Sequence, residues 1–243
     1  MRYFVHFLLC ACVMISISPH QVLGQKKNQK TTEKPNTNQA KSTNQAKSTT
    51  TTVSSESVLQ QVESFYKKQV DFKANFVQTF KYKIYNKKKI SSGKIFFKQS
   101  SKMLWHYEIP VQKLFISNGS TLWVYEPEEN QVFKRSLKGS QLPIALRFLL
   151  GNADLAEEFN IKPLQRNKKN QYQIKLIPKQ PSGDYQSLEL VIDPKSLQVV
   201  ASIITDPVGN HNHIKFTAMQ SNVNLKDSDF QFKIPKGVKV IEP

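Results

Sequence analysis

The chain has 243 residues, and its 35 Lys and Arg against 18 Asp and Glu give a formal net charge of +17. Such a balance favours nucleic acid, an anionic membrane or an acidic protein as partner, although a solvated basic surface would look the same. An export signal at the N-terminus argues against nucleic acid. Both cysteines, Cys10 and Cys12, lie in that segment, so the remaining chain has no disulfide and no cysteine metal ligand.

Residues 1–24 have the pattern of a secretory signal peptide. A basic start precedes the apolar run Phe4–Ile17, which is short for a spanning helix, and cleavage is expected near Gly24. An uncleaved anchor and a lipoprotein signal ending at Cys10 or Cys12 are the alternatives. The pattern predicts an exported protein of the bacterial periplasm.

Residues 25–55 are of low complexity. They contain Lys, Asn, Gln, Ser and Thr but no aromatic residue, and NQAKST occurs twice, at Asn38–Thr43 and Asn44–Thr49. Such a segment cannot bury a core, so we expect a disordered basic tether. Loose contact of this tether with an anionic membrane is a hypothesis.

The folded domain is expected over residues 56–243. A helix begins after Ser54 or Ser55, carries apolar residues at helical spacing and continues to about Val70. The apolar positions of this helix are Val58, Leu59, Val62 and Phe65.

The pattern then changes to alternation, which predicts strands separated by turns. Gly93 is a candidate bulge, and Asn118-Gly119 predicts a type I′ hairpin turn. The hairpin carries much aromatic surface in Phe115, Trp123 and Tyr125, which a core or an apolar ligand must cover. The expected strands are Phe72–Ile84, Ile90–Lys98, Lys102–Glu108, the two arms of Ile116–Pro127, and Asn130–Ser136.

Residues Leu142–Phe159 interrupt the strands with a helical pattern, and the first part is almost wholly apolar. Such a helix must press onto the sheet. Strands then resume at Asn160–Gln165, Gln171–Ile177, Tyr185–Ile192, Leu197–Thr205, His211–Gln220 and Phe230–Ile234. We therefore predict a mainly β (α+β) fold: a curved, open antiparallel sheet, or incomplete β-barrel, of about 11 strands with a helical lid over an apolar cavity.

Catalytic motifs are absent from the sequence, so we expect no enzyme, no cofactor and no metal. His211 and His213 alternate on one strand without an evident third ligand. Glu126, Glu128 and Glu129 read as a solvated turn. Lys87–Lys89 is either a charged hairpin tip or a contact for anionic head groups or a protein.

Several segments in order resemble the family of periplasmic outer-membrane lipoprotein carrier proteins, LolA. Phe72, Phe76 and Gln78 match the opening segment of the family, GKIFFK from Gly93 its glycine-led strand, and MLWHYEIP its tryptophan strand with Trp105. ISNGSTLWVYEP matches the hairpin block, and FQFKIPKGVKV from Phe230 matches the closing segment.

The resemblance implies a monomeric chaperone that binds the acyl chains of lipoproteins. Such carriers take lipoproteins from an inner-membrane ABC transporter and hand them to an outer-membrane acceptor. We expect alternate-face residues to line the lipid-binding cavity, although each could be ordinary core: Phe76, Phe80, Ile95, Phe97, Met103, Trp105 and Phe115. The lid residues are Leu142, Ile144, Leu146, Phe148 and Leu149.

One departure from the family concerns the latch of the lid. The family has an arginine before the strand tryptophan that bonds the lid backbone, and this position is Gln99 here. An amide lacks the charge, so a weaker latch is expected. A periplasmic lipid-binding sensor or regulator and a free-lipid carrier of the same fold are the alternative functions.

Overall fold

The computed structural model describes residues 53–137, 154–181 and 183–242. No helix within these ranges has the length and apolar character needed to span a bilayer. Three helices lie in them, α2 (Ser55–Lys68), α4 (Leu155–Glu158) and the 3₁₀ helix η1 (Asp227–Phe230). The strands are β1 (Asp71–Tyr82), β2 (Lys87–Lys98), β3 (Lys102–Ile109), β4 (Lys113–Asn118), β5 (Thr121–Glu126), β6 (Gln131–Ser136), β7 (Phe159–Ile161), β8 (Gln165–Arg166), β9 (Tyr172–Pro178), β10 (Ser187–Ile192), β11 (Val199–Thr205), β12 (His211–Ser221) and β13 (Lys239–Ile241).

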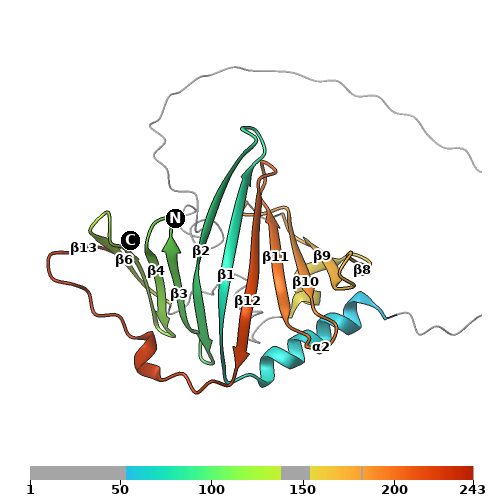
Figure 1. Ribbon diagram of the computed structural model, residues 1–243, viewed down its shortest axis with the longest axis horizontal. Coiled ribbons are helices and arrows are strands. Elements are labelled where there is room, and N and C mark those ends of the chain that lie inside the picture. Colours follow the sequence, from blue (N-terminus) through green and yellow to red (C-terminus); the bar gives the residue numbers. More distant parts are fainter. Residues whose placement is uncertain (1–52, 138–153, 182, 243) are drawn as a thin grey trace, which may run out of the picture. The chain divides into compact units, whose positions relative to one another are not determined.

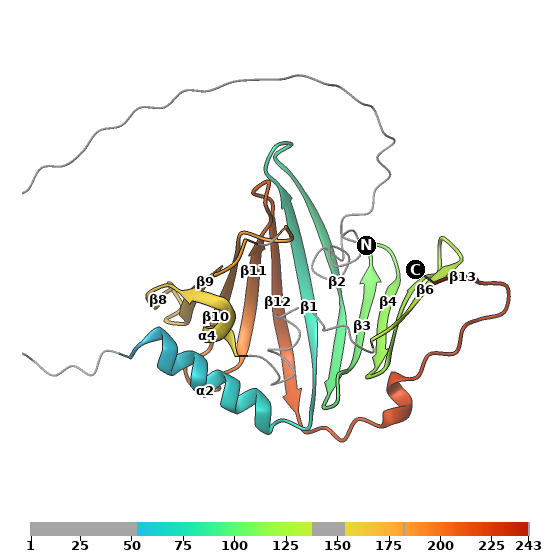
Figure 2. The same ribbon diagram turned by 180° about the vertical axis from the view of Figure 1, so that it is seen from behind.

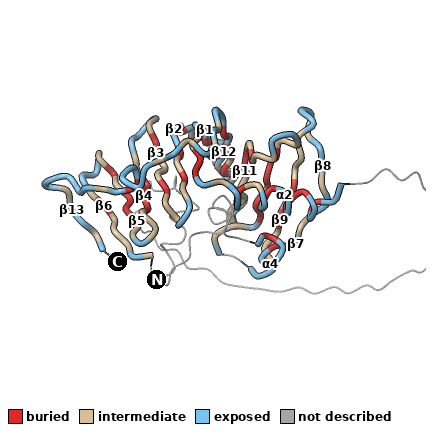
Figure 3. Tube along the Cα trace, turned by 90° about the horizontal axis from the view of Figure 1, so that it is seen from below, coloured by how far each residue is buried: buried red, intermediate tan, exposed pale blue. Residues whose placement is uncertain are grey.

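These strands form one sheet in the order β13-β6-β5-β4-β3-β2-β1-β12-β11-β10-β9-β7, with β8 paired to β9 (Figure 1). The edge strands β13 and β7 do not pair with each other, so the sheet is open, and seen along its strands it curves (Figure 3). The described residues thus confirm the mainly β, open, curved fold, with 13 strands where the sequence predicts about 11.

Strand β1 holds the centre of this sheet. It pairs antiparallel with β2 on one side and β12 on the other, and Phe76 lies opposite Gly93 and Phe216. The even-numbered residues of β1 from Phe72 to Phe80 are all buried. The alternation that predicted this strand therefore marks the buried face of the sheet.

Helix α2 lies across one end of strands β9 to β12 (Figures 1 and 2). The side chain of Ser54 accepts a hydrogen bond from Ser57 N at 3.1 Å, which caps the helix as the sequence predicts. Its buried stripe packs into the same cluster as the sheet and consists of Val58, Leu59, Val62 and Tyr66.

The end of α2 differs from the prediction. The helix ends at Lys68 rather than near Val70, and Tyr66 is buried while Phe65 is only partly so. The Tyr66 hydroxyl accepts a hydrogen bond from Val199 N of β11 at 3.0 Å. Burial raises the pKa of Tyr66 to about 12, although the bond from Val199 acts in the opposite direction. This bond ties the helix to the sheet.

The Asn118 hairpin forms, but the prediction of a type I′ turn is wrong. Two residues connect β4 to β5, and in this turn only Gly119 has a left-handed φ, at +96°, whereas a type I′ turn centred on Asn118-Gly119 needs a positive φ at both. The Asn118 side chain accepts hydrogen bonds from Ser120 N (3.0 Å) and Thr121 N (2.9 Å). This Asx arrangement closes the turn without a positive φ at the asparagine.

The C-terminal segment also departs from the prediction. The prediction of a strand over Phe230–Ile234 is wrong, because η1 occupies Asp227–Phe230 and the closing strand is β13. β13 pairs parallel with β6, so the sheet is not wholly antiparallel. Two interactions favour η1. Asp229 accepts a hydrogen bond from Lys226 N at 2.8 Å, and Asp227 forms ion pairs with lysines of neighbouring strands.

Those ion pairs predict an acid-sensitive anchor. Asp227 lies 2.7 Å from the ammonium groups of both Lys98 and Lys102, and their hydrogen bonds lower the pKa of Asp227 to about 2. A depressed pKa stabilises the native state above the ordinary carboxylate range, and this stabilisation disappears as the pH falls from about 4 to about 2. Urea unfolding of Asp227→Asn should therefore show lower stability at neutral pH and a shallower decline over that interval.

Glu128→Gln, on the exposed turn after β5, serves as the charge-matched control. The parent and this control should lose stability alike in acid. If Asp227→Asn followed the same pH curve as the parent, Asp227 would not act as an anchor.

Candidate functional site

The buried face of the sheet carries a continuous set of aromatic and aliphatic side chains. One cross-strand row runs from Ala74 through Ile95, Trp105 and Phe115 to Val124. A second row runs through Phe72, Phe97, Met103, Ser117 and Leu122. Figure 3 shows buried residues in the strands on both sides of β1.

Phe76 stands at the centre of this face. Its ring centroid lies 5.3 Å from that of Trp105 and 4.9 Å from that of Tyr107, both edge to face. Such pairs contribute about 0.5–1.5 kcal/mol each beyond area burial. Phe76, Trp105 and Tyr107 therefore form an aromatic centre, in which favourable ring geometry adds to the burial of apolar surface.

The structure brings six of the seven predicted lining residues into one cluster. Trp105 is only partly buried in it, while the buried members are Phe76, Ile95, Phe97, Met103 and Phe115. Phe80 is buried on the same side of β1 but lies outside this cluster, with its ring 4.8 Å from that of Tyr82. Whether these residues contact lipid stays a prediction.

Sequence reasoning missed the other half of the face. The same cluster extends across β9 to β12, and its alternating apolar residues were the available signal. These residues are Ile174, Leu176, Leu188, Leu190, Ile192, Val199, Ile214 and Phe216.

Two polar features interrupt the apolar face. Gln78 Nε2 donates to Asn212 Oδ1 at 2.7 Å, and both side chains are buried. The indole nitrogen of Trp105 is also buried, and no hydrogen-bond partner for it lies among the described residues. A buried donor of this kind is costly unless an acceptor satisfies it.

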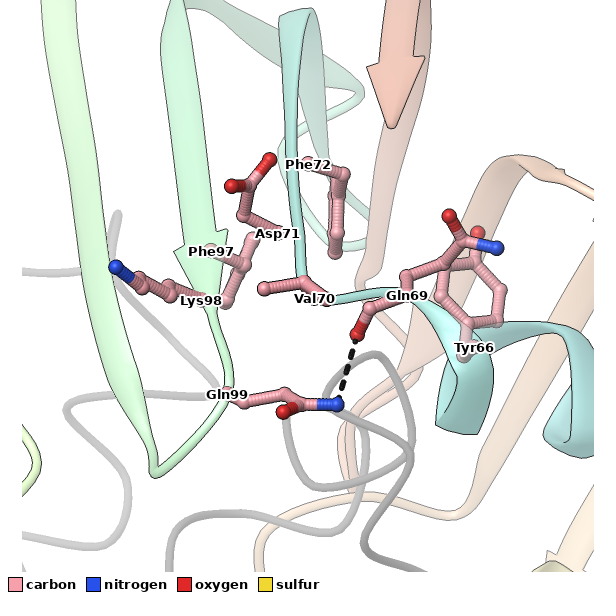
Figure 4. A pocket seen from close by; sticks show the side chains of 8 residues that line it. All are labelled: Tyr66, Gln69, Val70, Asp71, Phe72, Phe97, Lys98 and Gln99. Carbon is pink, nitrogen blue, oxygen red and sulfur yellow. Dashed lines mark hydrogen bonds between the residues drawn. The ribbon is translucent and has the colours of Figure 1, made fainter. Parts of the chain in front are cut away.

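Gln99, the predicted latch position, lies just after β2 and is exposed. Its Nε2 donates to Gln69 O at 3.2 Å (Figure 4). Its backbone N–H donates to Val70 O at 3.0 Å. These bonds join the β2–β3 turn to the segment between α2 and β1. Together with Phe72 and Phe97, whose stacked rings are 4.9 Å apart, these residues line a shallow pocket.

The predicted lid, Leu142, Ile144, Leu146, Phe148 and Leu149, lies outside the described residues, as do the signal segment and nearly all of the tether. The end of the predicted helical segment is described: α4 covers Leu155–Glu158, and Phe159 already begins β7. Asp154 caps α4 by accepting hydrogen bonds from Ala156 N and Glu157 N.

The opposite face of the hairpin has a small core of its own. Trp123 and Tyr125 face away from the main cluster, and their rings lie 6.3 and 5.3 Å from Phe232 of the C-terminal segment. The hairpin's aromatic surface is thus divided between two faces. As a result, the two tryptophans of the chain, Trp105 and Trp123, report on opposite sides of the sheet.

The histidine and glutamate residues singled out in the sequence analysis make contacts of a structural kind. Burial lowers the pKa of His213, and Lys215 and Lys81 lower it further, which favours the neutral ring. Glu126 forms an ion pair with Lys113 and accepts a hydrogen bond from Gln131 at 2.7 Å. Within the described part of the chain, no three His, Cys, Asp or Glu side chains are grouped to hold a metal ion.

Comparison with known proteins gives one consistent family. Residues 67–233 match the profile described as outer membrane lipoprotein carrier protein LolA. The outer-membrane lipoprotein carrier protein of Cupriavidus pinatubonensis is 32% identical over 152 residues, which are 63% of this chain and 70% of the relative. The protein of the same name from Methylibium petroleiphilum is 30% identical over 169 residues, 70% and 81% of the respective chains.

A solved structure shares the fold alone. An uncharacterized conserved protein from Thermus thermophilus superposes with a TM-score of 0.53 at 12% identity, and the match covers 76% of this chain and 97% of that one.

The close approach at Gly93 gives a test of the aromatic centre. A Cβ at Gly93 would lie 1.9 Å from His106 O, next to the strand position of Tyr107. Gly93→Ala should therefore push β2 and β3 apart and lower the free energy of unfolding by about 1–3 kcal/mol, measured by urea denaturation. Gly183→Ala is the control, because a Cβ there meets no atom within 4 Å. Equal stability of the two variants would contradict the close packing of β2 on β3.

Proposed function

The chain belongs to the family of outer membrane lipoprotein carrier proteins, LolA, and on that premise we propose that it binds the acyl chains of lipoproteins in the periplasm and delivers them to the outer membrane. The observation that supports this most is the single apolar cluster that extends over most of one face of the sheet. Acyl chains have no polar groups to recognise, so a broad apolar and aromatic face suits them.

Affinity sets a limit on how this face can work. Burying a CH₂ group contributes about 0.8 kcal/mol, so a chain of about 16 carbons could gain roughly 13 kcal/mol before ordering costs. Several fully buried chains would exceed the practical ceiling of about 20 kcal/mol and would not dissociate. A carrier therefore needs a competing state, and we propose that the apolar segment around Leu142–Leu149 covers the face when cargo is absent.

The head of the cargo needs a polar contact. The buried indole N–H of Trp105 has no acceptor among the described residues, and an acyl carbonyl could supply one. Binding at this position would place the linkage of an acyl chain beside the aromatic centre. This role is non-enzymatic, since no bond of the cargo is made or broken.

The route follows from the family. We propose that an inner-membrane ABC transporter supplies the lipoprotein and an outer-membrane acceptor receives it, with this chain as a monomeric intermediate between them. The exposed amide of Gln99 donates to Gln69 O of the α2–β1 segment, and we propose that a latch at this position has no charge-assisted hydrogen bond.

The two tryptophans provide a direct test of which face binds cargo. Titration of Trp123→Phe with a triacylated lipopeptide should change the emission of the remaining Trp105, because its surroundings are replaced by acyl chains. Trp105→Phe, which retains only Trp123 on the opposite face, is the matched control and should show no change. A signal that follows Trp123 would place the cargo elsewhere.

The complete function is tested by release from membranes. Inner-membrane vesicles bearing labelled lipoprotein and the ABC transporter are mixed with the protein and ATP and then sedimented. We expect acylated lipoprotein in the supernatant, bound to the protein. A double variant, Ile144→Asp with Phe148→Asp, should increase that uptake, because charged side chains weaken the covering state that competes with cargo.

Three results would contradict the proposal. Lipoprotein that stays in the pellet, while a known carrier releases it, would favour a lipid-binding sensor or regulator of the same fold. Co-purification of free lipid without acylated protein would favour a free-lipid carrier. Unchanged uptake by the double variant would contradict only the role proposed for the covering segment.

A further inference from the structure

Exposed apolar side chains are concentrated at one end of the sheet. The four most exposed large hydrophobic residues of the described chain are Ile84 (76%), Tyr85 (71%), Ile109 (62%) and Val208 (59%). Ile84 and Tyr85 occupy the β1–β2 turn, and Val208 occupies the β11–β12 turn. Ile109 ends β3 and pairs with Ser92 near the middle of β2, so it lies away from these two turns. Isolated exposed hydrophobic residues are ordinary, but a cluster at one end indicates a contact surface.

The β1–β2 and β11–β12 turns form one projection. Both extend beyond the neighbouring strands in the two opposite views (Figures 1 and 2). Lys83 N donates to Asn210 Oδ1 at 2.9 Å, and the Lys83 side chain runs beside Gly209, where a Cβ would lie 2.7 Å from its Cδ. We call this projection, Lys83–Lys89 with Asp206–Asn210, the double-turn tip.

Positive charge surrounds the apolar residues of the tip. Lys83, Lys87 and Lys88 are exposed and Lys89 is half-buried. The carboxylate of Asp206 accepts hydrogen bonds within its own turn, from Val208 N at 3.0 Å and Asn210 N at 2.8 Å. The exposed acidic residues Glu128 and Glu129 follow β5, which β4 and β3 separate from β2. The charge next to the apolar residues is therefore basic.

We propose that the double-turn tip docks onto anionic lipid bilayers, with Ile84, Tyr85 and Val208 in the interface and the lysines on lipid phosphates. Aliphatic side chains and the amphipathic ring of tyrosine suit the boundary between head groups and acyl chains. Each lysine near an anionic surface adds about 1 kcal/mol, roughly fivefold in partitioning. The tip thus combines the two kinds of attraction that peripheral membrane binding requires.

The shape of the tip favours a bilayer over a protein partner. Its apolar side chains are highly exposed on two turns, so a protein would have to supply a matching pocket. A bilayer supplies apolar depth at any position. The net charge of +17 for the chain complements the same surface. This docking site is separate from the apolar cluster of the sheet and from the basic tether of residues 25–55.

Vesicle sedimentation tests the proposal. The protein is mixed with vesicles of equal parts phosphatidylglycerol and phosphatidylcholine, or with phosphatidylcholine alone. We expect binding to the anionic vesicles that weakens with salt. The triple variant Ile84→Ser, Tyr85→Ser, Val208→Ser should lose about tenfold in partitioning. Lys87→Ser with Lys88→Ser should lose roughly 25-fold.

Matched controls remove exposed residues elsewhere in the chain. Val70→Ser, Val77→Ser, Val240→Ser is the apolar control, and Lys236→Ser with Lys239→Ser is the basic control. Both controls should bind like the parent. In a second measurement, Tyr85→Trp should gain a fluorescence component that brominated lipids quench, whereas Val240→Trp should not.

Other outcomes overturn the proposal. Failure of the protein to bind either kind of vesicle would contradict the proposal. Unchanged binding of the triple variant would leave the tip for a protein partner. Binding that disappears when residues 25–52 are deleted, yet resists the tip substitutions, would assign the membrane contact to the tether. The Trp105 lipopeptide signal should persist in the tip variants, so failure here is distinct from failure of the carrier function.

Discussion

The pairing of β1 with β2 and β12 decides which side chains can share the apolar face, because a shift of one residue would turn every side chain of a strand to the other side. Phe76 marks this register, as it lies opposite Gly93 on one strand and Phe216 on the other. Gly93 allows β2 to approach β3 closely, where Tyr107 meets the Phe76 ring at 4.9 Å. The aromatic centre therefore follows from backbone pairing rather than from any single strong contact.

The second face of the sheet is stabilised in another way. There the C-terminal segment packs Phe232 against Trp123 and Tyr125, while Asp227 pairs with Lys98 and Lys102 of two adjacent strands. Surface ion pairs contribute little individually, but here they hold a segment that covers two aromatic rings. The C-terminal segment thus covers part of the second face, while the larger apolar cluster lies on the first.

Alternation in the sequence predicted the strands on both sides of β1 and six members of the buried cluster, because a half-buried strand repeats every two residues. The parallel pairing of β13 with β6 could not be predicted, since it depends on where η1 directs the chain. The Asn118 turn failed for a local reason: an asparagine side chain can close a turn by hydrogen bonding instead of by a positive φ. The double-turn tip also depends on tertiary pairing, because its two turns are more than a hundred residues apart in sequence.

Gln99 stands where the family resemblance implies a latch arginine, and in this structure its side chain contacts the segment between α2 and β1. A neutral hydrogen bond contributes about 0.5–1.5 kcal/mol, whereas one to a charged group contributes about 1.5–3 kcal/mol. The bond from Gln99 to Gln69 is neutral and exposed, so it lies at the weak end of this range. Under the proposed carrier function, a closed empty state held by uncharged contacts would compete less with cargo and would raise the net affinity for acyl chains. Release would then depend more strongly on the proposed acceptor.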